Sequence, residues 1–179
     1  IAFTKGTVNY TDGNGLYSAE LLRGRAISPM SVSGDYSVTM TGSKSYNRFR
    51  LYYCFTDDSN TYYVDVEPTQ VSIKKVKDGK ETTIAPAKAI GFTTNAEVDV
   101  EVIYSSLNGV SVVVRSGDKA VYPISNIKDN TFASGKFGCG IWDTPGYLKE
   151  IVLRRYLLPN DSAFDRQDVS VDKPIEIGF

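Results

Sequence analysis

The fold is decided by residues 47–85, which read NRFRLYYCFTDDSNTYYVDVEPTQVSIKKVKDGKETTIA. This stretch contains three runs rich in Tyr, Val, Phe and Ile, at 48–55, 62–66 and 71–76. Clusters of Asp, Asn, Gly and Pro separate the runs and close the last one at 77–80. Strand-length apolar runs between such turn residues are typical of an antiparallel meander. The stretch therefore predicts three consecutive antiparallel strands.

The rest of the chain has the same character. Turn residues recur about every 8–12 positions, and no segment has a 3.6-residue period. Residues 25–32 contain Pro29 and are predicted to be irregular or an edge strand, while 84–87 and 90–92 are predicted to lie in a linker. The pattern predicts an all-β fold, a two-sheet antiparallel β-sandwich. We expect one module over residues 1–158 and a C-terminal tail or linker over 159–179.

The composition argues against two classes of partner. The 179 residues carry a formal net charge of −1, whereas binding to nucleic acid requires a basic surface. No apolar run approaches the roughly 20 residues of a membrane-spanning helix, so no membrane insertion is expected. The sequence begins at Ile1, with neither an initiator Met nor a signal peptide, and we expect it to be part of a larger multidomain protein.

The chain has no histidine and two cysteines. The lack of histidine excludes Ser-His-Asp and Cys-His nucleophilic machinery and His-ligated zinc or iron. Cys54 and Cys139 each fall within an expected strand. Two buried thiols are the simpler interpretation, because a core cysteine packs as a small hydrophobe. A disulfide is the alternative if the two strands are neighbours.

Alternation along 48–55 divides this run between two faces. The face expected in the core holds Phe49, Leu51, Tyr53 and Phe55, and the opposite face holds Arg48, Arg50, Tyr52 and Cys54. The next strand adds Tyr63 and Asp65 to a polar face. Arginine forks donate to hydroxyls or carboxylates, and tyrosine rings can stack on a ligand. This polar face is the candidate ligand site.

The expected strand at 136–142 ends with the only Trp of the chain. Gly138 and Gly140 share a face with Trp142 and leave a bare strip beside its ring. A bare strip beside a large ring suits a flat sugar, and the neighbouring Asp143 could accept hydrogen bonds from hydroxyls. The alternative is that Trp142 only caps one end of the sandwich.

Two acidic turns offer oxygen ligands of the kind that Ca²⁺ accepts. One contains Asp12 and Asn14, and the other contains Asp57 and Asp58. Neither completes an EF-hand loop, and ordinary turn chemistry explains both. A structural Ca²⁺ at these residues is the alternative, and no cofactor is expected to be required.

Four pieces of the chain resemble a known family in their order and spacing. They are GDYSV at 34–38, YYCFTDDSNTYY at 52–63, SIKKVKDGKETT at 72–83 and GKFGCGIW at 135–142. This order is similar to that of the concanavalin A-like, laminin-G-like jelly rolls appended to secreted bacterial polysaccharide-degrading enzymes. The match covers nearly the whole chain up to Arg155.

The resemblance implies a sandwich of two antiparallel sheets, one of them concave, that binds sugar or protein ligands on that face or at its rim. It also implies a secreted, extracellular protein, and related modules often carry a structural Ca²⁺. Cys54 stands where the family pattern has an arginine. If that arginine contacts ligand in relatives, Arg48 or Arg50 would take over the contact here.

A further motif, Glu97-Val98-Asp99-Val100-Glu101, resembles the active-site strand of laminarinase-type glycoside hydrolases. The resemblance implies a nucleophile at Glu97, an electrostatic helper at Asp99 and a general acid/base at Glu101. Residues four apart on a strand are roughly 13 Å apart at the backbone, whereas retaining hydrolysis needs carboxyls about 5–5.5 Å apart. The alternative is a one-sided strand whose valines face the core and whose acids face water.

The sequence favours a non-catalytic carbohydrate-binding module that recognises a polysaccharide or glycan. The expected contacts come from Arg50, Tyr52, Tyr63, Asp65 and Trp142. One alternative is a glycoside hydrolase or polysaccharide lyase that uses the strand of Glu97, Asp99 and Glu101. The other is a laminin-G-like protein-interaction or structural accessory domain.

Overall fold

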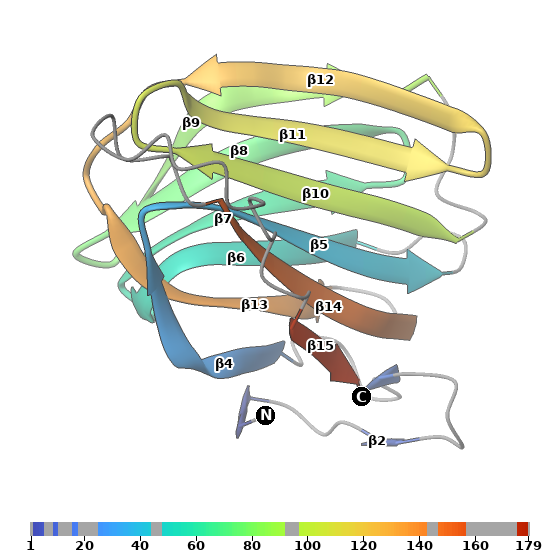
Figure 1. The fold of residues 1–179 in the computed structure, drawn as a ribbon, viewed down its shortest axis with the longest axis horizontal. Helices are drawn as coiled ribbons and strands as arrows, with labels where there is room; N and C mark the ends of the chain where they lie inside the picture. Colours follow the sequence, from blue (N-terminus) through green and yellow to red (C-terminus); the bar gives the residue numbers. More distant parts are fainter. Residues whose placement is uncertain are drawn as a thin grey trace, which may run out of the picture.

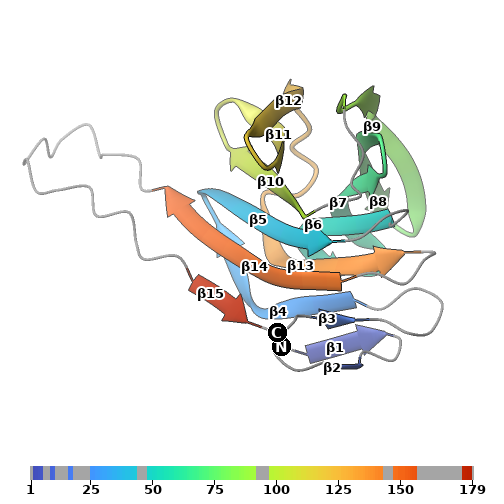
Figure 2. The ribbon, with the colours of Figure 1, turned by 90° about the vertical axis from the view of Figure 1, so that its right-hand side faces the viewer.

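The computed structural model describes residues 2–5, 9–10, 16–17, 25–43, 48–91, 97–142, 147–156 and 175–178. Every regular element in these ranges is a β-strand. The strands form two sheets that lie face to face as two layers (Figures 1 and 2). All pairings are antiparallel among the described residues. The predicted two-sheet antiparallel β-sandwich is therefore confirmed.

The rear layer in Figure 1 is a seven-stranded sheet in the order β1-β4-β13-β6-β7-β8-β9. Its strands are β1 (Ala2–Lys5), β4 (Arg25–Ser33), β13 (Ser134–Trp142), β6 (Arg48–Asp57), β7 (Asn60–Glu67), β8 (Gln70–Lys77) and β9 (Lys80–Ala89). The adjacent strands β6, β7 and β8 are the meander that the opening stretch predicts, which is thereby confirmed.

The front layer in Figure 1 is an eight-stranded sheet in the order β12-β11-β10-β5-β14-β3-β2, with β15 paired to β14. Its strands are β12 (Lys119–Ile127), β11 (Gly109–Ser116), β10 (Val98–Ser105), β5 (Asp35–Ser43), β14 (Tyr147–Tyr156), β3 (Leu16–Tyr17), β2 (Asn9–Tyr10) and β15 (Ile175–Gly178). Strand β15 falls within the predicted tail at 159–179 and pairs with β14. The boundary between module and tail stays a prediction.

The core between the sheets is built from valines and aromatic rings. The rings of Tyr53 and Tyr62 stack with their centroids 5.1 Å apart, and both side chains are buried. Burying a large apolar side chain contributes about 1.5–3 kcal/mol, so each of these rings adds to the packing energy of the core. Tyr53 and Tyr62 therefore serve the sandwich interior.

Two segments differ from their predictions, which are irregular structure or an edge strand for residues 25–32 and part of a linker for residues 84–87. The segment with Pro29 is the full strand β4, paired with β1 on one side and β13 on the other. The β4–β13 register shifts beside Pro29, so the missing N–H falls at an irregularity in the ladder. The expected linker at 84–87 belongs to β9, an edge strand of this sheet. Pro86 is tolerated there, because an edge strand can lack a donor on its open side.

Strand β6 departs from simple alternation at Cys54. Its φ is +47°, and the register with β7 shifts between Tyr53 and Asp57. As a result Cys54 packs in the core and Phe55 turns to the outer face. The predicted faces of Cys54 and Phe55 are therefore wrong, because a bulge adds a residue that strict alternation does not count.

Gly135 makes room for this bulge. A Cβ at Gly135 would lie 2.5 Å from the Cys54 carbonyl carbon, and its φ of +155° also disfavours other residues. The Cys54 thiol lies 3.4 Å from the Tyr36 hydroxyl. Cys54 and Cys139 are both buried and free, so the structure has the two buried thiols rather than the disulfide. Burial raises the pKa of Cys54 to about 11 and that of Cys139 to about 12.

Within the described residues, no helix has the length and hydrophobicity that a membrane crossing requires.

Candidate functional site

The predicted ligand residues of β6 and β7 meet on the side of the seven-stranded sheet that points away from the core. Arg50 lies opposite Asp65 in the β6–β7 ladder, and Tyr52 lies opposite Tyr63. Neighbouring strands add further side chains to this side. We call the whole set the seven-stranded face: Arg25, Ile27, Arg48, Arg50, Tyr52, Phe55, Tyr63, Asp65, Glu67, Lys74 and Glu81.

Asp65 is the electrostatic centre of this face. It is 1% exposed, and Arg48 donates to both of its oxygens, with an Nε–Oδ1 distance of 2.8 Å. The Nε of Arg50 and the Nζ of Lys74 each lie 3.7 Å from its oxygens. These neighbours are required because the desolvation of a buried carboxylate is costly unless cations and hydrogen bonds compensate for it. Asp65 on β7 thus holds three cations in place, two from β6 and one from β8.

An aromatic layer lies under these charges. Tyr52 contacts Tyr63 at a centroid separation of 5.8 Å and Phe55 at 6.0 Å. The Arg50 guanidinium carbon lies 4.2 Å from the centroid of Tyr63, a cation–π geometry. Tyr52 and Tyr63 are only 3% and 1% exposed. In this structure neither ring offers a free face for stacking, so the two tyrosines act as the floor beneath the charged layer.

The exposed rim of the face consists of alternating charges. The Tyr63 hydroxyl donates to Glu81 at 2.5 Å, and Lys74 donates to the other Glu81 oxygen at 3.1 Å. Partial burial acts to raise the pKa of Glu81, but these two hydrogen bonds outweigh it and lower the pKa below the ordinary value of 4.5. The Glu81 side chain is 46% exposed, so it presents a carboxylate to solvent.

Several members of this face could not be found from the sequence. Arg25 on β4 pairs with Asp58, and its guanidinium carbon lies 5.3 Å from the centroid of Phe55. Lys74 and Glu81 come from a lysine-rich hairpin that reads as a solvated surface. Period-2 alternation indicates that Lys74 lies on the face opposite to that of the buried Ile73. Only the register across β7, β8 and β9 shows which partner each residue meets.

The remaining predicted residues fall outside this network or outside the described residues. The backbone of Trp142 pairs with Arg48 in β13–β6, but its side chain lies outside the description. Asp143, Asp12 and Asn14 are likewise outside the described residues. Stacking by Trp142 and hydrogen bonding by Asp143 therefore stay predictions. Ca²⁺ binding by Asp12 and Asn14 also stays a prediction.

The second acidic turn is committed to protein contacts. Asp57 accepts a hydrogen bond from the Ser59 backbone N–H at 2.7 Å, as turn chemistry expects, and Asp58 pairs with Arg25. No group of three or more His, Cys, Asp or Glu side chains in the described part of the chain is arranged to hold a metal ion. Calcium binding by Asp57 and Asp58 stays a prediction without added support.

The acidic strand motif lies on the other side of the sandwich. Val98, Val100 and Val102 are in the core, as the one-sided interpretation expects. Glu97 precedes β10 and is exposed, Asp99 accepts from Thr41 at 2.6 Å, and Glu101 pairs with Arg115 at 2.8 Å. Glu101 is only 7% exposed, so the expectation that all three acids face water is wrong for this residue. The arginine partner explains its burial.

Solved structures share this fold across most of the chain. The carbohydrate binding module CBM66 from Bacillus subtilis aligns at a TM-score of 0.67 and 18% identity, over 85% of this chain and 93% of its own. CG-16, a homodimeric agglutinin from chicken liver, aligns at a TM-score of 0.52 and 13% identity, over 72% of this chain and 98% of its own. A native glycosidic hydrolase aligns at a TM-score of 0.53 and 14% identity, over 83% of this chain and 80% of its own. No protein-family model and no curated protein sequence matches the chain.

Proposed function

We propose that this protein is a non-catalytic carbohydrate-binding module whose seven-stranded face binds a polysaccharide or oligosaccharide. The observation that carries the proposal is the charged layer around Asp65, in which Arg48 of β6, Lys74 of β8 and Glu81 of β9 reach solvent. Guanidinium and ammonium groups donate to sugar hydroxyls, and carboxylates accept from them. The layer therefore offers both kinds of partner that a sugar requires.

The network also prepares the face for binding. Arg48 is held by two hydrogen bonds to Asp65, and Lys74 is held between Asp65 and Glu81. Side chains that are already ordered lose less rotamer freedom when a ligand arrives. The tyrosine floor contributes by fixing the layer from below rather than by stacking on sugar. Likeness of fold to the carbohydrate binding module CBM66 and to the agglutinin CG-16 supports the same class of ligand.

A catalytic role is disfavoured by the arrangement of the acidic strand. Glu97 is exposed ahead of β10, while the Glu101 carboxylate is engaged by Arg115. A retaining hydrolase needs two working carboxyls about 5–5.5 Å apart, one of them able to give up a proton. We expect glycans that bind the protein to remain intact. Incubation followed by assays for reducing ends and for unsaturated lyase products checks this, and turnover that disappears in Glu101→Gln would contradict it.

The binding face is tested with two lysines of the same strand. Lys74 belongs to the charged layer, whereas Lys77 is exposed at the end of β8 and makes no ion pair with a described residue. The wild-type protein is first screened on an array of plant, microbial and animal glycans. For a glycan that binds, Lys74→Met should weaken affinity at least about fivefold, because a charged hydrogen bond contributes about 1.5–3 kcal/mol. Lys77→Met, which removes the same charge, should bind like the wild type.

The outcomes separate the alternatives. Equal affinity of Lys74→Met and the wild type would move the site away from this face. An array without any binding would favour the laminin-G-like protein-interaction or structural role. Thermal melting of each variant shows whether it remains folded.

Two further expectations from the family resemblance are part of the proposal. We propose that the module belongs to a larger secreted protein and that any Ca²⁺ it holds is structural. A rise in Tm on adding Ca²⁺ that EDTA reverses would support the second point.

A further inference from the structure

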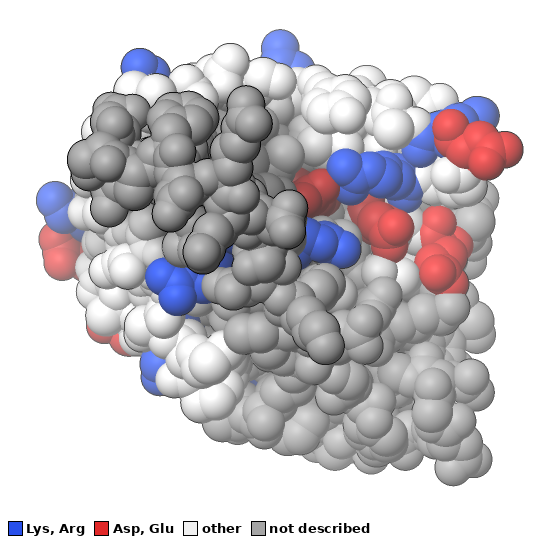
Figure 3. Space-filling model, viewed as in Figure 1, with Lys and Arg blue, Asp and Glu red and all other residues white. Residues whose placement is uncertain are grey.

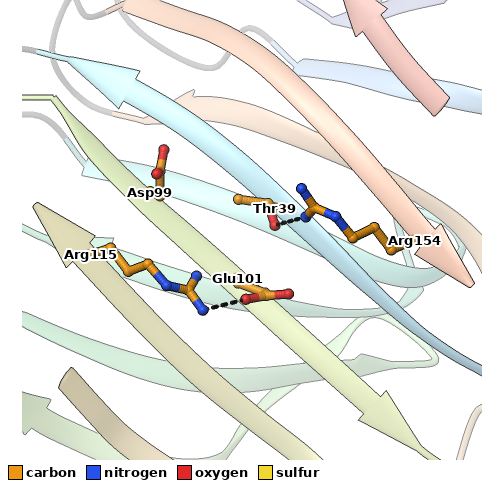
Figure 4. Close-up of a pocket in the computed structure, with 5 residues that line it drawn as sticks. All are labelled: Thr39, Asp99, Glu101, Arg115 and Arg154. Atoms are coloured by element: carbon orange, nitrogen blue, oxygen red, sulfur yellow. Dashed lines mark hydrogen bonds and ion pairs between the residues drawn. The ribbon is translucent and has the colours of Figure 1, made fainter. Parts of the chain in front are cut away.

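A polar hollow lies on the opposite side of the sandwich from the proposed binding face. It has a volume of about 380 Å³ and is lined by Thr39 of β5, Asp99 and Glu101 of β10, Arg115 of β11 and Arg154 of β14 (Figure 4). Small-ligand sites occupy about 300–1,000 Å³, so the hollow is large enough for a single small unit. Figure 3 views the molecule from this side and shows acidic and basic side chains next to one another.

Part of the polar lining is not used by the protein itself. Arg154 donates to the Thr39 hydroxyl at 3.2 Å and pairs with no carboxylate of the described residues. Asp99 accepts from Thr41 through Oδ1, and its Oδ2 has no hydrogen bond from the described part of the chain. Figure 4 shows Arg154 and Asp99 on different sides of Thr39. The hollow thus holds a guanidinium and a carboxylate oxygen with capacity for a ligand.

The other charged pair closes the hollow on its β11 side. Arg115 and Glu101 are joined at 2.8 Å, and Glu101 is buried while Arg115 is partly exposed. This pair fixes the wall and leaves further guanidinium donors of Arg115 available, because a guanidinium carries five N–H groups.

The charges of the lining decide the class of ligand. Two carboxylates and two guanidiniums sum to zero, so neither an anion nor a cation is favoured by the net charge. Donors and acceptors lie side by side, which matches vicinal hydroxyl groups that both donate and accept. We propose that this hollow is a second carbohydrate site, which takes one neutral sugar unit. The choice of sugar as the ligand rests on the proposed function of the seven-stranded face, but the residues of the two sites are separate.

No aromatic side chain is among the described residues that line the hollow, so these residues would hold a sugar by polar contacts alone. Such contacts replace hydrogen bonds to water, and the affinity of a single unit should be weak. Two sites on opposite sides of one module could nevertheless engage two polysaccharide chains, or two stretches of one chain, and gain avidity.

The experiment titrates the ¹⁵N-labelled protein with glucose, galactose, mannose, fructose and xylose, one at a time, and follows the backbone amides. At least one sugar should shift the amides of Thr39, Asp99 and Arg154 in a saturable way. Amides of Arg48, Asp65 and Lys74 report the seven-stranded face separately. Failure of the proposed function and failure of this inference therefore give different spectra.

A matched pair of variants tests the role of the free guanidinium. Arg154→Met removes the guanidinium that lines the hollow, and Arg155→Met removes the same charge from the next residue, which is exposed and does not line it. We expect Arg154→Met to weaken the response of the hollow at least about fivefold and Arg155→Met to leave it unchanged. No saturable shift at the hollow with any of the five sugars, or an equal response in Arg154→Met, would overturn the proposal.

Discussion

The two outer faces of this sandwich place charged side chains on a sheet in different ways. On the seven-stranded face a buried carboxylate, Asp65, organises three cations above an aromatic floor. On the eight-stranded face the charged groups form one close pair, Glu101 with Arg115, beside a hollow that contains Arg154 and Asp99. The charges of the first face form a connected network. Those of the second face form an ion pair beside two charged groups, Arg154 and Asp99, that can still accept a ligand.

This difference follows from the side chains that lie between the charged groups and the sheet on each face. Tyr52, Tyr63 and Phe55 fill the space beside the sheet on the first face, so the charges above them are forced together and partly desolvated. Small polar side chains such as Thr39 and Thr41 occupy the second face, and Arg154 and Asp99 stand apart from the Glu101–Arg115 pair. Desolvated charges depend on each other, while solvated charges act more independently.

The largest effect is expected at the centre of the network. Asp65→Asn would leave Arg48, Arg50 and Lys74 without their buried counter-charge. Breaking a buried pair costs about 3–5 kcal/mol, and we expect a loss of free energy of unfolding of this size. Urea denaturation measures it. Asp118→Asn, which changes an exposed carboxylate in the turn between β11 and β12, is the control and should change stability by about 0.5 kcal/mol or less. A similar effect of the two substitutions would mean that the network is not cooperative.

A smaller effect is expected on the eight-stranded face. Arg115→Met leaves Glu101 buried without its cation and should cost about 2 kcal/mol, the desolvation penalty of one unsatisfied group. Combining it with Glu101→Met should recover most of the loss, because an apolar pair has no charge to desolvate. A double-mutant cycle by chemical denaturation checks this. If the double variant is as unstable as the sum of the single variants, the pair contributes no coupling.

The smallest effect is expected at the rim and depends on pH. Tyr63→Phe removes the hydrogen bond that helps lower the pKa of Glu81. A depressed folded-state pKa contributes stability above the ordinary value of 4.5, and this stability is lost as pH falls through the folded-state pKa. The variant should therefore be about 1 kcal/mol less stable than the wild type at pH 6–7, and the difference should shrink below about pH 4.

Tyr122→Phe is the matched control for this pH experiment. Its side chain is exposed on β12, a strand of the other sheet, and removal of its hydroxyl should leave stability unchanged at every pH. Melting temperatures between pH 3 and 7 give the comparison. A difference between Tyr63→Phe and the wild type that is constant over this range would contradict the link to Glu81.

Period-2 alternation was sufficient to predict which residues of β6 and β7 share the outer face. It placed Arg48, Arg50, Tyr52, Tyr63 and Asp65 on one side of two adjacent strands, and the structure has them there. Alternation could not show that Tyr52 and Tyr63 are covered, because burial on an outer face depends on side chains from other strands. Arg25 reaches the Tyr52 ring from β4, which is separated from β6 by β13 in the sheet.

The sequence by itself determined the all-β fold, the meander and, apart from Cys54 and Phe55, the faces of the meander's first strand. Turn residues and period-2 alternation are local properties, and a one-residue slip would expose the whole apolar set. Only the tertiary structure decided the bulge at Cys54, the pairing of β4 with β13, and the partners of Asp65 and Glu101. These depend on which strands become neighbours and in what register. Packing of the two sheets settles that choice, and no local pattern of residues encodes it.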